Sequence, residues 1–152
     1  MNSIRYYYQC FKYGIKNLFT YFPIIWKDRD WDQYYFYVLL QFKLKKIRNR
    51  LNLNLFEGSE DVVKEIDIAI EALERIIDDN YCKEEWSLID DKYGKLIFKN
   101  NSIVREKTLT PEKEESERND ILNISKLENE RRTSDIKLVC NIIEKNVETW
   151  WD

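Results

Sequence analysis

The stretch Asp28-Arg29-Asp30-Trp31-Asp32 holds the residues whose type and spacing could do metal chemistry. Carboxylates at every second position match the first three ligands of an EF-hand calcium loop. That loop then needs a glycine and a bidentate glutamate, whereas this chain has Gln33 and Leu39 at those positions. The spacing therefore predicts no metal site, and we interpret the aspartates as helix caps and as ion-pair partners of Arg29 or Lys27.

Other catalytic groups are scarce. The chain has no histidine, which removes His-based acid/base catalysis and the Ser-His and Cys-His nucleophilic systems. Its three glycines stand alone, so no glycine-rich phosphate loop is present. Cys10, Cys82 and Cys140 lack metal-ligand spacing, and we expect buried free thiols in a reducing compartment. These absences predict a protein that is not an enzyme and that carries no cofactor.

Positive charge is densest in the stretch 43–50. Two hypotheses fit it: a face that binds the phosphates of nucleic acid or a nucleotide, or a solvated helix end that complements the helix dipole. The residues are Lys43, Lys45, Lys46, Arg48 and Arg50.

Tryptophans lie before and within the aspartate stretch, and two more lie next to the last residue of the chain. Trp26 and Trp31, with Arg29, lie at the predicted corner between two aromatic helices. We expect Trp150 and Trp151 to pack against that corner, or to form a binding hot spot for a partner.

The helix before that corner is predicted by an apolar stripe at helical spacing within residues 4–22. Pro23 should end it, because proline cannot donate the next backbone hydrogen bond. We expect the stripe to pack on the rest of the fold; attachment to an anionic membrane surface is an alternative. The stripe consists of Ile4, Tyr7, Tyr8, Phe11, Ile15, Leu18, Phe19 and Phe22.

Two further helices follow from the same periodicity. The first should begin near Asp28 or Asp30 and run about twenty residues to Leu51, with its apolar first half at the centre of the core. The second should begin at Ser59 and end near residue 80. Its stripe is Val62, Ile66, Ala69, Ile70, Leu73 and Ile77.

The remainder reads as a hairpin and a long helix. Segments 95–99 and 102–106 flank Asn100-Asn101, a pair that tolerates the positive φ angles of a tight turn, and the ribbon should lie on the helices. Thr110 followed by Pro111 begins a nearly continuous helix whose last four turns pack on the core. Its predicted stripe is Ile136, Val139, Cys140, Ile143, Val147 and Trp150.

Composition supports one domain. The 152 residues suffice for a single core, and too few glycines and prolines are present for an all-β fold. We predict a mainly α, compact domain over 1–152, with four or five helices and a small β-hairpin near 95–106. The charged segment 112–135 could project as a separate arm. Residues 1–50 carry ten Lys/Arg and three Asp/Glu, which makes this third strongly basic.

The Asp-Arg-Asp-Trp-Asp motif at 28–32 and the terminal Trp150-Trp151-Asp152 resemble a family of small uncharacterised proteins of tailed bacteriophages. The chain has Tyr93-Gly94 where that family has a Trp-Gly pair. The resemblance implies a phage origin and a cytoplasmic site of action in the host, without a known mechanism. No apolar run exceeds seven residues, and charges interrupt the N-terminus, so we expect no transmembrane segment and no signal peptide.

These observations favour a phage accessory protein that binds a host or phage protein non-covalently, perturbing a host or defence system. Segment 112–135 would serve as an interaction or homo-oligomerisation arm. The alternatives are binding of nucleic acid or a nucleotide through 43–50 and membrane-surface attachment through 4–22.

Overall fold

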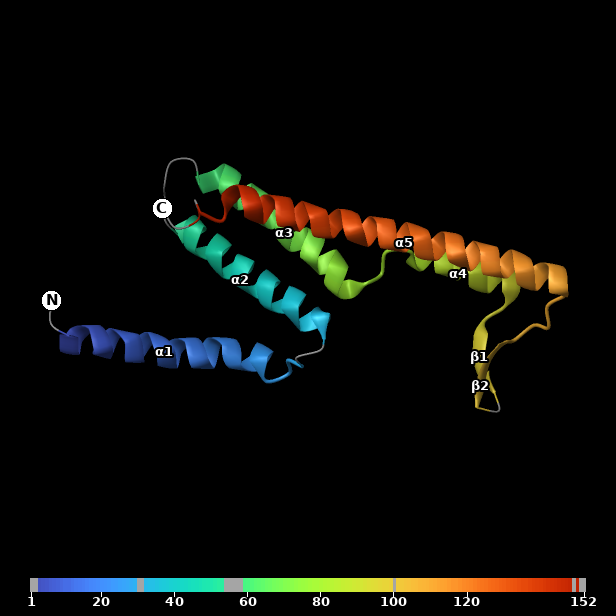
Figure 1. Cartoon of the computed structure of the whole chain (residues 1–152), viewed down its shortest axis with the longest axis horizontal. Coiled ribbons are helices and arrows are strands. Elements are labelled where there is room, and N and C mark those ends of the chain that lie inside the picture. Colours follow the sequence, from blue (N-terminus) through green and yellow to red (C-terminus); the bar gives the residue numbers. More distant parts are fainter. Residues whose placement is uncertain (1–2, 30–31, 54–58, 100, 149, 151–152) are drawn as a thin grey trace.

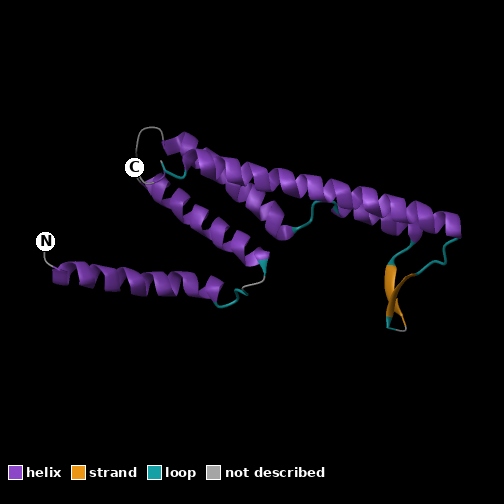
Figure 2. Cartoon of the chain, in the orientation of Figure 1, coloured by secondary structure: helices purple, strands orange, loops and turns teal. Residues whose placement is uncertain are grey.

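Helices make up most of the structure, and a short hairpin precedes the last of them. The computed structural model describes residues 3–29, 32–53, 59–99, 101–148 and 150. Within these ranges the order is α1 (Ser3–Ile25), α2 (Gln33–Leu53), α3 (Ser59–Asp78), α4 (Lys83–Tyr93), β1 (Leu96–Lys99), β2 (Ser102–Arg105) and α5 (Pro111–Asn146). This confirms the predicted mainly helical fold with a small hairpin near 95–106 (Figure 2).

The core lies where α3 packs against both α2 and α5 (Figure 1). The predicted stripe of α3 is confirmed: its four central residues are buried, and Val62 and Ile77 are half-buried. Facing side chains come from the second halves of α2 and α5. The core residues are Leu44, Ile47, Ile66, Ala69, Ile70, Ala72, Leu73, Ile76, Val139, Ile142 and Trp150.

The first half of α2 is not the centre of the core, contrary to the prediction. Phe36 and Tyr34 are exposed, and the buried residues of this helix are Leu44 and Ile47. The helix also begins later than predicted, at Gln33. The side chain of Asp32 caps it, because its Oδ1 accepts a hydrogen bond of 2.9 Å from the backbone N–H of Tyr34. Asp30 lies outside the described residues.

The last helix, α5, is continuous over 36 residues, as predicted, with Pro111 in its first turn. Its second half packs on α3 and its first half on α4 (Figure 1). The buried face is rotated from the predicted stripe: it includes Asp135 and Asn146, whereas Cys140 is exposed. Buried polar side chains are tolerated where they are hydrogen-bonded, and Asn146 donates to the carbonyl of Ile142 and to Glu65.

The helix α4 was not predicted from the sequence. Its eleven residues carry only a weak apolar pattern, and packing on α5 buries Ile89 and Tyr93. The hairpin that follows is confirmed, with Phe98 opposite Ile103 and Ile97 opposite Val104. The expectation that the ribbon lies on the helices is wrong, since its apolar side chains are exposed.

The first helix, α1, departs from two predictions. It continues past Pro23 to Ile25, so the proline lies within its last turn instead of ending it. Its stripe is exposed and does not pack on the fold; close to the corner the ring of Tyr21 meets that of Phe42, with centroids 5.3 Å apart. Figure 1 shows α1 extending away from the α3–α5 layer.

Candidate functional site

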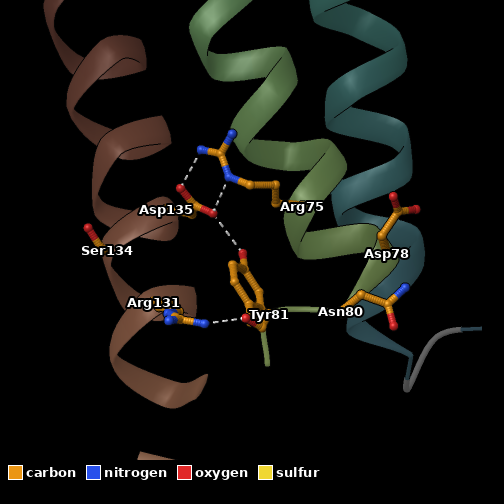
Figure 3. A pocket seen from close by; sticks show the side chains of 7 residues that line it. All are labelled: Arg75, Asp78, Asn80, Tyr81, Arg131, Ser134 and Asp135. Carbon is orange, nitrogen blue, oxygen red and sulfur yellow. Dashed lines mark hydrogen bonds and ion pairs between the residues drawn. The ribbon is translucent and has the colours of Figure 1, made fainter. Parts of the chain in front are cut away.

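A cavity of about 490 Å³ lies where the end of α3, the turn before α4 and the middle of α5 meet. Its lining is polar and charged, and Figure 3 shows Arg75, Tyr81 and Asp135 pointing toward one another. The lining residues are Arg75, Asp78, Asn80, Tyr81, Arg131, Ser134 and Asp135.

Asp135 is the centre of this cavity's hydrogen bonds. Its carboxylate accepts from Nε and Nη2 of Arg75, at 2.9 and 2.7 Å, and from the hydroxyl of Tyr81 at 2.9 Å (Figure 3). The paired Arg75 guanidinium, helped by Tyr81, holds the pKa of Asp135 below its usual range. Burial and the hydrogen bond to Asp135 raise the pKa of Tyr81. Both groups therefore keep one protonation state near neutral pH.

The polar groups of the cavity are engaged with one another: both carboxylate oxygens of Asp135 accept hydrogen bonds from Arg75, and the hydroxyl of Tyr81 donates to the same carboxylate. Arg131 donates from Nη1 to the carbonyl of Tyr81 at 2.5 Å and pairs with Glu85 at 2.9 Å. The cavity therefore marks the joint that fastens the α3–α4 turn to α5, and we assign it a structural role.

A second polar cluster lies at the base of the hairpin. Arg105, with its side chain 10% exposed, pairs with Glu117 of α5 at 2.6 Å and Asp90 of α4 at 2.8 Å. It also donates to the carbonyl of Gly94 at 2.5 Å. Nearby, the hydroxyl of Tyr93 donates to Asp120 at 2.7 Å. This cluster fixes the direction in which the hairpin leaves the body.

Two residues of the predicted basic cluster interact with side chains of neighbouring helices. Arg48 pairs with Asp67 of α3 at 2.9 Å, and the Nζ of Lys46 lies 5.0 Å from the ring centroid of Tyr21. Lys45 is half-buried. Lys43 and Arg50 are exposed. Phosphate binding by this cluster stays a prediction.

Trp26 and Trp150, the two described tryptophans of the predicted corner, do not pack together. Trp26 is three-quarters exposed and touches the ring of Phe22, with centroids 5.1 Å apart. Trp150 is buried in the core with side chains of α2, α3 and α5. Arg29 is exposed, and Trp31 and Trp151 lie outside the described residues.

The largest exposed apolar surface of the described chain is on α1. We call it the α1 stripe: the eight residues predicted from the sequence, extended by Ile25 and Trp26. Each is between 42% and 84% exposed. Sequence periodicity revealed this face, but it could not show that the face is left uncovered.

The α1 stripe has positive charge along one of its edges. At 3.6 residues per turn, Ile4 and Phe22 fall at its middle, and Tyr8 and Trp26 fall toward one edge. Beyond that edge follow the exposed cations Arg5, Lys12 and Lys16. No Asp or Glu occurs among the first 27 residues, although the chain has 28.

None of the described helices combines the length and apolar character needed to cross a bilayer. The described residues also bring together no cluster of three or more cysteine or carboxylate side chains that could hold a metal ion. Comparison of the chain with protein-family models, with curated proteins and with solved structures finds no match.

Proposed function

We propose that the protein attaches to an anionic membrane surface through α1. The observation that carries this proposal is the exposed α1 stripe, ten apolar or aromatic side chains on one helix face with cations beside them. Helices that lie in a membrane interface have this pattern: an apolar face with aromatic residues, and a polar face rich in Lys and Arg.

The charge of α1 favours an anionic surface. Arg5, Lys12 and Lys16 lie on the helix and Lys27 follows it, without any carboxylate in the first 27 residues. Near an anionic leaflet each such cation contributes about 1 kcal/mol. Protein interfaces, by contrast, are depleted in lysine.

The length of the stripe also favours lipid. It runs from Ile4 to Trp26, and a 23-residue helix is about 35 Å long. A protein groove would have to match that whole length, whereas a bilayer surface is continuous. Along one edge of the stripe, Tyr8 and Trp26 separate the apolar middle from the cations, which matches the order of acyl chains, interface and headgroups.

The apolar contribution is sufficient for binding. If about five side chains of the stripe insert, at roughly 1.5 kcal/mol each, they contribute about 7 kcal/mol. That free energy corresponds to half of the protein being bound at roughly 10 μM accessible lipid, before the contribution of the cations is added.

Vesicle flotation of the full chain tests the proposal. We expect binding to vesicles of phosphatidylcholine with phosphatidylserine, weaker binding to phosphatidylcholine alone, and loss of binding in Phe11→Ser/Leu18→Ser. The matched control is Tyr6→Ser/Tyr13→Ser, which changes two exposed side chains on the other face of α1. Wild-type protein that stays unbound, or equal loss in both double variants, would overturn the proposal.

The hypothesis of a phage accessory protein with a host or phage protein as partner stays a prediction. It would be favoured over membrane attachment if the α1 stripe variant lost a protein partner while vesicle binding was absent from the wild type. The same flotation experiment therefore separates the two functions.

A further inference from the structure

The hairpin exposes apolar side chains that its own fold does not cover. Alternation along the strands places Leu96, Phe98 and Ile103 on one face. Phe98 and Ile103 are directly paired, and they are 74% and 70% exposed. A two-stranded ribbon is marginally stable unless something covers one face. The described chain does not cover this one.

Ion pairs and a backbone hydrogen bond nevertheless hold the base of the hairpin to the helices. Arg105 ends β2, and its largely buried side chain forms ion pairs with Asp90 and Glu117, one from each of the two helices at its base. The backbone N–H of Glu106 also donates to the carbonyl of Lys95 at 2.9 Å, which continues the ladder toward the body. The hairpin therefore presents the exposed side chains of Phe98 and Ile103 in a fixed direction relative to the helices.

Figure 1 shows that direction. The view is along the shortest axis of the molecule, and both α1 and the hairpin leave the layer of α3, α4 and α5 on the same side. The hairpin lies near the start of α5, which is the end farther from the α2–α3 core. One flat surface can therefore touch α1 and the tip of the hairpin together.

The charge of the hairpin matches that of α1. Residues 95–107 contain Lys95, Lys99 and Lys107, all exposed, against the single carboxylate of Glu106. Three apolar side chains cannot supply the about 800 Å² per partner that a stable protein interface buries. One inserted aromatic ring, however, strengthens attachment to lipid without any matching pocket.

We propose that the hairpin is a second membrane contact, with Phe98 and Ile103 entering the same anionic lipid surface that α1 binds. This inference rests on the proposed function of α1. Two contacts at opposite ends of the molecule fix its orientation, so α5 lies along the membrane and the face opposite α1 and the hairpin points to solvent.

A fluorophore at the tip tests the insertion directly. In full-length protein with Cys10→Ser, Cys140→Ser and Ile103→Cys, an NBD label stands beside Phe98 on the face of the ribbon that should enter the lipid. We expect its emission to shift to shorter wavelength with phosphatidylserine-containing vesicles. The control is the Cys10→Ser chain labelled at native Cys140 of α5, which should show no shift. Equal emission with and without vesicles, in protein shown by flotation to be bound, would overturn the inference and leave the function of α1 intact.

Substitutions supply the second measurement. Phe98→Ser/Ile103→Ser should weaken vesicle binding roughly tenfold. Ile97→Thr/Val104→Thr, on the opposite face of the ribbon, should leave it unchanged. If wild-type protein does not bind vesicles at all, the proposed function itself fails. If Phe98→Ser/Ile103→Ser instead changes the mass of lipid-free protein by light scattering, the face joins two copies of the chain and the inference is wrong.

Discussion

Replacing Asp135 with asparagine tests the joint between α3, the α3–α4 turn and α5. Asparagine has nearly the same shape but no charge, and one of its two terminal atoms is a donor. The Asp135 side chain is 11% exposed and accepts three hydrogen bonds, two from Arg75 and one from Tyr81. In Asp135→Asn, the amide N–H₂ faces a guanidinium donor in either orientation, because each carboxylate oxygen of Asp135 accepts a hydrogen bond from Arg75.

The cost can be summed from these contacts. Arg75 has a side chain 51% exposed and regains water, so loss of the ion pair costs only about 1 kcal/mol. The hydrogen bond from Tyr81 to a charged acceptor adds about 1 kcal/mol, and the buried donor–donor contact adds about 1 kcal/mol. We expect a total near 3 kcal/mol, which lowers the melting temperature of a chain of this size by roughly 10 °C.

The pH dependence of this difference has a definite sign. The pKa of Asp135 in the folded protein is below its usual value, chiefly because of the hydrogen bonds from Arg75. A depressed carboxyl pKa stabilises the fold above the unfolded pKa, and that stability is lost as the pH falls through the folded pKa. The difference between wild type and Asp135→Asn is therefore full above about pH 5 and shrinks below it.

Urea denaturation followed by circular dichroism measures the difference. Asp91→Asn, an exposed carboxylate on α4, is the control and should change the unfolding free energy by less than about 0.5 kcal/mol. A loss in Asp135→Asn below about 1 kcal/mol at neutral pH would contradict the assigned role of the joint. So would a difference that stays constant between about pH 7 and about pH 3.

Two further predictions concern buried side chains. Trp150→Ala should lower the unfolding free energy by about 3–5 kcal/mol by leaving a cavity in the core, measured by urea denaturation. Trp150→Phe should cost much less, since the indole N–H has no hydrogen-bond acceptor in the described structure; equal losses would contradict this packing. Among the thiols, Cys82 is fully buried, and burial raises its pKa. A thiol reagent should therefore modify Cys10 and Cys140 in the native protein and Cys82 only on unfolding, whereas three equal rates would show that Cys82 is accessible.

The parts of the fold that were predictable are those in which local pattern and tertiary packing agree. The stripe of α3 is apolar at helical spacing and is buried against α2 and α5, so its periodicity was sufficient to predict the helix and its buried face. The start of α5 was readable from Thr110 and Pro111, and the hairpin from its two short apolar runs.

Other features depend on contacts between distant residues. The helix α4 is held by interactions that periodicity cannot show, such as the hydrogen bonds of Tyr93 to Asp120 and Ser116 of α5. Likewise Asp135 and Arg75 are sixty positions apart, and each alone reads as an ordinary surface charge. The α1 stripe was visible, but an apolar face does not reveal which surface covers it.

The continuity of α5 ties the angular position of the hairpin to that of the core. Each residue of an α-helix advances the chain by about 100° around the axis, so five turns pass in about 18 residues. An insertion of one or two residues midway along α5 would turn the face of α5 that packs on α4 away from the end of α3, to which α4 is joined by the short turn 79–82. An insertion of about 18 residues would restore the phase, but it would move that face about 27 Å along the axis, farther than the four residues of the turn can span. The helix thus sets both the angle and the distance between the core and α4, and insertions midway along it should not be tolerated.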